Sequence, residues 1–189
     1  MKNIAIFASG AGSNAQKIID HFRQSDKARV SLIVCNKPGA GVLQIAEREG
    51  IPSLLIEKDK FLHSDIYIQI LQEQQTDLVV LAGFLWKIPA NLVQAFPKRI
   101  INIHPALLPK FGGKGMYGHF VHEAVIAAGE KESGITIHYV NEKYDDGETI
   151  LQERCTITPD DTPETVARKV QALEHQWFPV IVERLLTTI

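Results

Sequence analysis

The chain has 189 residues, of which 45% are hydrophobic, and its 20 basic and 22 acidic side chains leave a formal net charge of −2. This length and composition are typical of one globular domain with a sizeable core, so we expect residues 1–189 to form a single domain. The near-neutral charge argues against a nucleic acid or a membrane surface as partner, although it allows a local basic site for a small anion.

Apolar runs alternate with helical patterns through the first hundred residues. Pro52 cannot donate to a strand ladder, so the strand that contains it is placed at an edge of the sheet. Apolar strands that alternate with helices indicate an α/β fold with a doubly wound, mostly parallel, Rossmann-like sheet. The expected strands cover residues 2–8, 29–35, 51–56, 77–82 and 100–103, and the expected helices residues 13–23, 41–49, 65–74 and 91–96.

The first strand leads into a glycine loop, residues 9–14, with the sequence SGAGSN, and a helix follows. Glycines let a ligand approach the backbone, and a helix N-terminus attracts anions, so the loop is a candidate phosphate site. Gly10, Gly12 and Ala15 also fit the dinucleotide fingerprint, which expects an acidic residue at the end of the second strand. Asn36 and Lys37 stand there instead. A phosphate ester is therefore favoured over a dinucleotide, and a tight turn without a ligand is the alternative.

Two polar side chains mark the end of the fifth predicted strand. Asn102 and His104 are two residues apart and point to the same face, and Pro105 ends the strand. Open α/β sheets bind their ligands at the carboxyl ends of strands, which makes the pair a candidate site. The spacing fits equally well a polar strand terminus whose side chains satisfy nearby backbone groups.

The pattern changes after residue 130. Residues 135–140 and 149–158 are predicted strands with Asp145, Asp146 and Gly147 between them, which indicates a late antiparallel addition to the sheet. A long helix then begins with Thr162 as N-cap and Pro163 at its first position. Its apolar face carries Val166, Val170, Leu173 and Trp177, and Pro179 is expected to kink or split it.

Three features bear on the compartment. Cys35 and Cys155 form no CxxC pair, which argues against a zinc ribbon or a thioredoxin-like motif, and we expect both to be buried free thiols in a reducing cytoplasm. The first ten residues are too strand-like for a signal peptide. No apolar run approaches the roughly 20 residues of a membrane-spanning helix.

Six segments spread over nearly the whole chain share one resemblance. They are FASGAGSN at 7–14, LAGF at 81–84, NIHPALLPK at 102–110, GITIHYV at 134–140, DDGETILQ at 145–152 and VQALEHQWFP at 170–179. Together they resemble the phosphoribosylglycinamide formyltransferases, a folate-dependent family of purine biosynthesis with its own variant of the α/β fold. The resemblance implies transfer of the formyl group of 10-formyltetrahydrofolate to the amine of 5'-phosphoribosylglycinamide. It further implies small-molecule substrates only, a monomer or homodimer, and no metal.

The resemblance also implies roles for individual residues. Asn102, His104 and Asp145 would be catalytic. The ribonucleotide would be held by Gly12, Ser13 and Asn14 at its phosphate and by Glu174 at its ribose. The folate would contact Leu85, Trp86, Lys87, Ile88, Asn102, Val140 and Asn141.

The sequence departs from the family pattern at three places. Leu85, Trp86 and Lys87 stand where the family often has a Met-Arg pair, and Ser64 stands where an arginine often helps to hold the folate tail. Residues 111–120 are longer than the usual loop, and their four glycines suggest a mobile lid. These departures concern the folate tail and leave the reaction intact.

The chemistry needs hydrogen-bond donors aimed at the oxyanion that forms when the amine attacks the formyl carbon. Asn102 is a neutral donor, and a protonated His104 would be a charged one. We expect Asp145 to lie beside His104 and to raise its pKa. Either His104 or a bound water would carry the proton from the amine to the leaving nitrogen.

The remaining histidines and aromatic residues have structural interpretations. His138 lies in an apolar strand and is expected to be a hydrogen-bonded core residue, and His175 beside Glu174 to be structural. His119 and His122 are three apart, which is weak evidence for a metal site. Trp177 and Phe178 are expected in the core.

Three other functions are weighed against this interpretation. Formyltetrahydrofolate deformylases share the residues around Asn102, His104 and Asp145 but carry an extra N-terminal domain, which we do not expect because the first strand begins at Lys2. Methionyl-tRNA formyltransferases carry an added C-terminal domain, which is also not expected. A non-catalytic nucleotide-binding module has no need of the three catalytic residues.

Overall fold

The structure, a computed structural model, describes all residues from 1 to 189 and contains one seven-stranded sheet. The strand order is β3-β2-β1-β4-β5-β6-β7. Neighbouring strands from β3 to β5 run parallel, and β6 and β7 are added antiparallel, as the sequence predicts. The strands are β1 (Lys2–Ala8), β2 (Ala28–Cys35), β3 (Ser53–Leu55), β4 (Thr76–Leu81), β5 (Ile100–His104), β6 (Glu132–Tyr139) and β7 (Thr149–Thr156).

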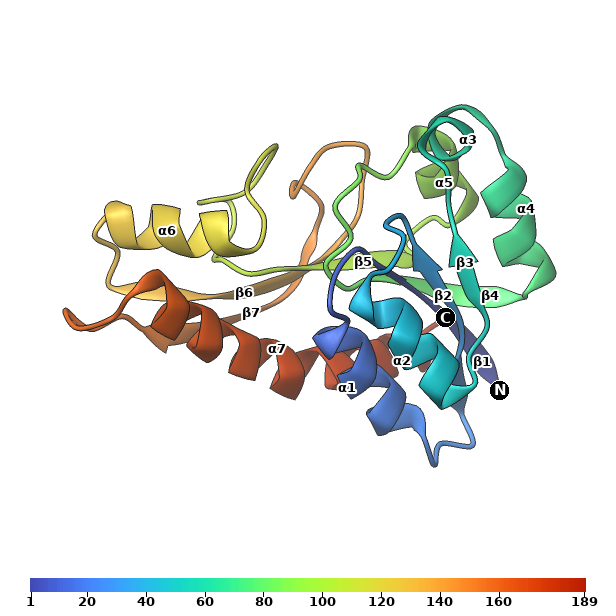
Figure 1. The fold of residues 1–189 in the computed structure, drawn as a ribbon, viewed down its shortest axis with the longest axis horizontal. Coiled ribbons are helices and arrows are strands. Elements are labelled where there is room, and N and C mark those ends of the chain that lie inside the picture. The colour runs from blue at the N-terminus through green and yellow to red at the C-terminus, as the bar shows by residue number, and fades with distance from the viewer.

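Helices cover both faces of the sheet, and each face has its own core. Alternate residues of one strand serve opposite cores, because strand side chains point to opposite faces: Ile4 and Ile6 pack in one, Ala5 and Phe7 in the other. The first core is covered by α1 (Ser13–Phe22), α2 (Gly41–Glu49), α6 (His119–Ala127) and α7 (Pro163–Leu186). The second is covered by α3 (Lys58–His63), α4 (Ile66–Glu73) and α5 (Ala90–Ala95), which lie together in Figure 1.

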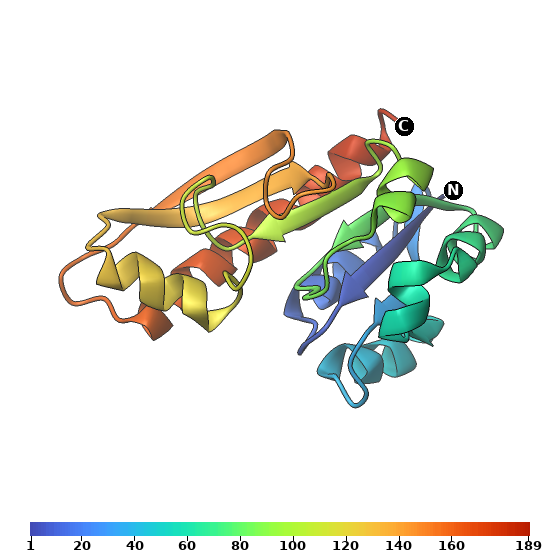
Figure 2. The same ribbon diagram turned by 90° about the horizontal axis from the view of Figure 1, so that it is seen from above.

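The last helix, α7, runs along most of the length of the molecule. Its start is fixed by the predicted N-cap: Thr165 N donates to Thr162 Oγ1 at 3.3 Å, and Thr162 N donates to Thr165 Oγ1 at 2.8 Å. Figures 1 and 2 show α7 running from the side of α6 and β7 past α1 to the C-terminus. Pro179 was expected to kink or split this helix; the split is wrong, because one helix continues through Pro179. Phe178, Ile181 and Val182 are each at most 2% exposed, and their burial outweighs the one hydrogen bond that proline removes.

Several predicted elements need correction. The sequence pattern missed α3, a six-residue helix with one buried side chain, Phe61, and it missed α6, which follows a glycine-rich segment. The predicted start of β6, at 135, is three residues late, because the strand includes Gly134, where a Cβ would overlap the carbonyl oxygen of Glu153. Cys35 is buried, but Cys155 is only half-buried, because it lies on the edge strand β7.

The strand order indicates where a ligand would bind. The order reverses between β1 and β4, and open α/β sheets bind ligands beyond the carboxyl ends of the strands at such a point. The glycine loop follows β1, and residues 82–88 follow β4. Ser9 joins these two loops, because Ser9 N donates to the carbonyl of Gly83 and Leu85 N donates to Ser9 Oγ, at 3.1 and 2.9 Å. None of the helices combines the length and the apolar character of a membrane span.

Candidate active site

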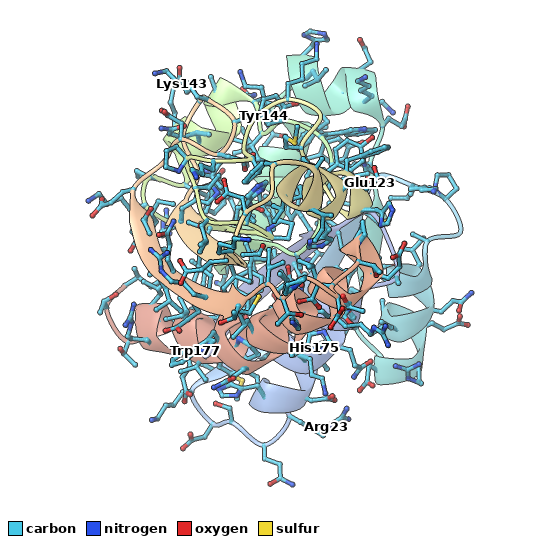
Figure 3. All side chains as sticks on the ribbon, turned by 90° about the vertical axis from the view of Figure 1, so that its left-hand side faces the viewer. Arg23, Glu123, Lys143, Tyr144, His175 and Trp177 are labelled. Carbon is cyan, nitrogen blue, oxygen red and sulfur yellow. The ribbon has the colours of Figure 1, made fainter.

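A cavity of about 830 Å³ lies at the carboxyl ends of β1, β4 and β5. We call it the central cavity. The glycine loop, the start of the β4–α5 loop and the end of β5 line it, together with segment 113–119, Tyr144, Asp145 and the first half of α7. Figure 3 looks at the end of the molecule formed by α6, β6, β7 and α7, and it labels Tyr144 on the β6–β7 loop and His175 on α7. Segments far apart in the sequence thus enclose one space.

The three predicted catalytic residues meet in this cavity. Asp145 Oδ2 lies 3.6 Å from His104 Nδ1, and Asn102 Nδ2 lies 3.5 Å from Asp145 Oδ1. The backbone N–H of Gly113 also donates to Asp145 Oδ2, at 2.9 Å. Asp145 has a positive φ of 50°, so its backbone lies in the left-handed region that aspartate tolerates better than most residues. The carboxylate is therefore held between β5 and the 111–120 segment rather than merely capping its own turn.

His138 is a fourth member of this cluster that the sequence did not place there. It lies directly opposite Asn102 in the β5–β6 pair and is 2% exposed. Its Nδ1 donates to the carbonyl of Tyr139 at 2.9 Å, which leaves Nε2 as an acceptor for Asn102 Nδ2 at 3.1 Å. Its prediction as a hydrogen-bonded core residue is confirmed. One N–H of Asn102 is committed to His138, while the second is held only weakly by Asp145.

The hydrogen on His104 can be assigned from its partner. His104 Nε2 lies 2.7 Å from the carbonyl oxygen of Phe111, which can only accept, so Nε2 carries a hydrogen. Burial lowers the pKa of His104, and the opposing effects of Asp145 and of the bond to Phe111 do not overcome it. The expectation that Asp145 brings this pKa above its usual value is wrong, because only 4% of the His104 side chain is exposed and desolvation disfavours the imidazolium.

For the carboxyl group of Asp145, neighbouring groups outweigh the effect of burial on the pKa. Burial alone would raise its pKa, but His138, the charge of His104 and the N–H of Gly113 together hold the pKa below its usual value. At 3.7 Å, His138 Nε2 contacts Asp145 Oδ1 at longer than hydrogen-bond distance. The site therefore combines an ionised Asp145 with a mostly neutral His104 near pH 7. It can accept one proton on His104 and stabilise the resulting imidazolium.

The glycine loop presents the N-terminus of α1, and no side chain caps that helix. Gly12 has a φ of 83°, and a Cβ there would lie 2.9 Å from Val42 Cβ and from Ile45 Cδ1. Asn14 Nδ2 donates to Glu174 Oε2 at 2.8 Å, so the loop and α7 meet through two of the predicted ribonucleotide ligands. Asn14 and Glu174 line the central cavity, whereas Gly12 and Ser13 do not. Burial raises the pKa of Glu174, and the bond from Asn14 only partly opposes this.

The predicted folate residues are divided by the structure. Leu85 and Asn102 line the central cavity, while the other five do not. Ile88 is 3% exposed, and Trp86 packs against Phe61 and Phe84 at ring-centroid distances of 5.9 and 6.1 Å. Lys87 Nζ lies 5.9 Å from the ring centroid of Tyr144. Val140 packs beside the second core, and Asn141 Nδ2 donates to Asp146 Oδ2 at 3.2 Å. The folate roles of these five residues stay predictions.

The other histidines are explained by their surroundings. Both His119 and His122 line the cavity: His119 is half-exposed and pairs with Glu123 at 2.9 Å, whereas His122 is 6% exposed. Trp177 and Phe178 pack in the first core, as expected. Burial lowers the pKa of three histidines, which are His104, His122 and His175. Tyr144 lies within residues 140–145, which the resemblance places at the pterin pocket, whereas the cavity positions of Lys37, His122 and Gln171 were not predicted, because each depends on how distant segments pack.

Comparison with known sequences gives one consistent result. Residues 2–182 match the profile of the family described as formyl transferase. The Bacillus subtilis phosphoribosylglycinamide formyltransferase is 39% identical over 191 residues, which cover 98% of this chain and 95% of that protein. The chloroplastic phosphoribosylglycinamide formyltransferases of Arabidopsis thaliana and Vigna unguiculata are 46% and 42% identical over 96% and 97% of this chain. The alignments span only 64% and 61% of the length of these two plant proteins.

Solved structures agree with the sequence relatives. The phosphoribosylglycinamide formyltransferase from Bacillus halodurans superposes with a TM-score of 0.87 at 39% identity, over 98% of this chain and 95% of that one. The glycinamide ribonucleotide transformylase 1 from Symbiobacterium toebii gives a TM-score of 0.90 at 31% identity, over 100% of this chain and 89% of that one. The predicted fold, including its late antiparallel strands, is confirmed.

Proposed function

The chain belongs to the formyl transferase family, and we propose that it is a phosphoribosylglycinamide formyltransferase. It transfers the formyl group of 10-formyltetrahydrofolate to the amine of 5'-phosphoribosylglycinamide, giving formylglycinamide ribonucleotide and tetrahydrofolate in purine biosynthesis. The observation that carries the proposal is the meeting of Asn102, His104 and Asp145 in a cavity that also contains the glycine loop.

The cluster supports each step of this acyl transfer. The neutral amine attacks the formyl carbon, and a tetrahedral intermediate with an oxyanion forms. The weakly held N–H of Asn102 turns to this oxyanion, while the N–H bound to His138 keeps the amide in place. His104 takes the proton from the amine, and Asp145 stabilises the imidazolium. The bond from the formyl carbon to the folate nitrogen then breaks, and that nitrogen receives the proton.

The bond between His104 Nε2 and Phe111 adds a requirement. Nε2 is occupied by a backbone carbonyl at the start of the 111–120 segment, and Nδ1 faces Asp145. His104 therefore exchanges one of these partners when it contacts substrate. Movement of the segment releases Nε2, which links the proposed lid to the catalytic group.

The two substrates bind to different parts of the site. The phosphate binds at the N-terminus of α1 through Gly12, Ser13 and Asn14, and Glu174 binds the ribose. The pterin lies against residues 85–88 and 140–145, including Leu85 and Val140. The family resemblance implies a reaction without a metal, and no group of three His, Cys, Asp or Glu side chains in the structure could hold one.

The compartment and the oligomeric state are proposed with the same function. Two free thiols fit a reducing compartment such as the cytoplasm, and the single domain would act as a monomer or a homodimer. Its partners would be its small-molecule substrates.

The test is an incubation of the chain with 10-formyltetrahydrofolate while tetrahydrofolate is followed by absorbance. We expect release only when phosphoribosylglycinamide is present. Equal release without the ribonucleotide would assign the chain to the deformylases instead. No release under either condition would contradict both functions.

A further inference from the structure

Lys37 follows directly after β2 and lines the central cavity together with Ser9, Gly10 and Asn14. We propose that its ammonium group binds the phosphate of the ribonucleotide and makes the site select a phosphorylated substrate over its nucleoside. This inference rests on the proposed function, since it concerns a further residue for the same substrate.

The position of Lys37 is fixed by its backbone. Its N–H donates to Cys35 Sγ at 3.4 Å, and its carbonyl accepts from Cys35 Sγ and from Ala40 N, both at 3.3 Å. The turn that carries it is pressed against the glycine loop: Val42 N donates to the carbonyl of Gly10 at 3.1 Å. A Cβ at Gly41 would lie 3.0 Å from the carbonyl oxygen of Ala11. The start of the lysine side chain is thus held beside the predicted phosphate loop.

A phosphate on the glycine loop would lie near acidic side chains of the cavity, so a cation beside the loop would favour its binding. Two carboxylates line the cavity, Asp145 and Glu174, and Glu174 bonds directly to Asn14 of the glycine loop. A phosphate placed on that loop therefore meets a carboxyl group nearby. Two lysines line the cavity, and the other one, Lys114, belongs to the 111–120 segment. Lys37 takes part in no ion pair, so its charge is available to the ligand.

The residue before it supports the same assignment. Asn36 stands where a dinucleotide-binding chain carries an acid that bonds to the ribose hydroxyls. A carboxylate there would pair with Lys37 and repel a phosphate. The neutral amide does neither, which leaves the end of β2 with a net positive charge. The alternative is a solvated surface lysine without a role.

The test compares Lys37→Met with Lys17→Met, which removes the same charge from an exposed position on α1 outside the cavity. Binding of phosphoribosylglycinamide and of its dephosphorylated riboside is measured by calorimetry, with turnover followed separately. We expect Lys37→Met to weaken binding of the ribonucleotide about ten- to hundredfold, as for loss of a hydrogen bond to a charged group, and to leave the riboside unchanged. Lys37→Arg should restore most of the affinity, and Lys17→Met should change neither ligand.

Two results would overturn the assignment of Lys37. One is a Lys37→Met variant that binds the ribonucleotide as tightly as the unmodified chain. The other is equal weakening for ribonucleotide and riboside, which is what a merely structural role predicts. Failure of the proposed function would give a different result. The unmodified chain would then bind the ribonucleotide more tightly than the riboside but form no formylated product. A chain that binds ribonucleotide and riboside equally would count against Lys37 as well.

Discussion

Replacing Asp145 by asparagine isolates the charge of the cluster while keeping its shape. Asp145 Oδ2 and His104 Nδ1 are 3.6 Å apart. At an effective dielectric constant of about 20, a pair of unit charges at this distance attracts by roughly 4–5 kcal/mol once His104 is protonated. If about 2.7 kcal/mol of this attraction is lost in the transition state, turnover falls about a hundredfold. Asparagine still accepts the hydrogen bond from Gly113, so the fold should persist.

The assay has a kinetic and a spectroscopic part. Turnover is measured with saturating ribonucleotide and formyl folate, and the titration of His104 is followed by NMR. Because Asp145 opposes the effect of burial on His104, its removal should lower the pKa of that histidine further. Asp146→Asn is the matched control, since it removes a neighbouring charge whose partners are Asn141 and Lys143. Turnover that survives in Asp145→Asn, with an unmoved His104 titration, would refute the reasoning.

Three other predictions concern the loop, the lid and pH. Gly12→Ala should raise the KM for the ribonucleotide far more than that for the folate, because the left-handed backbone and the crowding around its Cβ displace the phosphate loop; equal effects on both would contradict this. Binding of both substrates should protect the 111–120 segment from proteolysis. An unchanged cleavage rate would contradict its proposed role as a lid. The three histidines whose pKa is lowered by burial, His104, His122 and His175, bind fewer protons in the folded chain than in the unfolded chain. Denaturant titrations should therefore show the free energy of unfolding falling as the pH drops from about 7.5 to about 5.5, by at most about 1.4 kcal/mol per pH unit for each histidine, and a flat or rising value would contradict the assignment.

The parts of the fold that are set by local pattern could be predicted from the sequence. Strand periodicity placed Asn102 and His104 on one face of β5, and Pro52 correctly marked β3 as an edge strand. The capping of α7 by Thr162 follows from short-range chemistry as well. Such features depend on residues close together in the chain, so one sequence suffices.

The features that were missed depend on packing between distant segments. His138 enters the site because the β5–β6 register sets it opposite Asn102, and its strand alone reads as core. The pKa of His104 depends on how completely the surrounding segments bury it, which outweighs the carboxylate that the sequence did identify. The packing of the Trp86 ring against Phe61 was not predicted either, because Phe61 lies on α3, a helix that the sequence pattern did not reveal. Each case needs the three-dimensional arrangement of the chain.

The measurement that tests the proposed formyl transfer most directly uses 10-formyltetrahydrofolate labelled with ¹³C in the formyl group. The label is followed by NMR in the presence of phosphoribosylglycinamide and the chain. We predict that it appears as a formamide carbon on the glycinamide nitrogen, at the same rate as tetrahydrofolate is formed. Label that appears as formate, with the ribonucleotide unchanged, would contradict the assignment as a transferase.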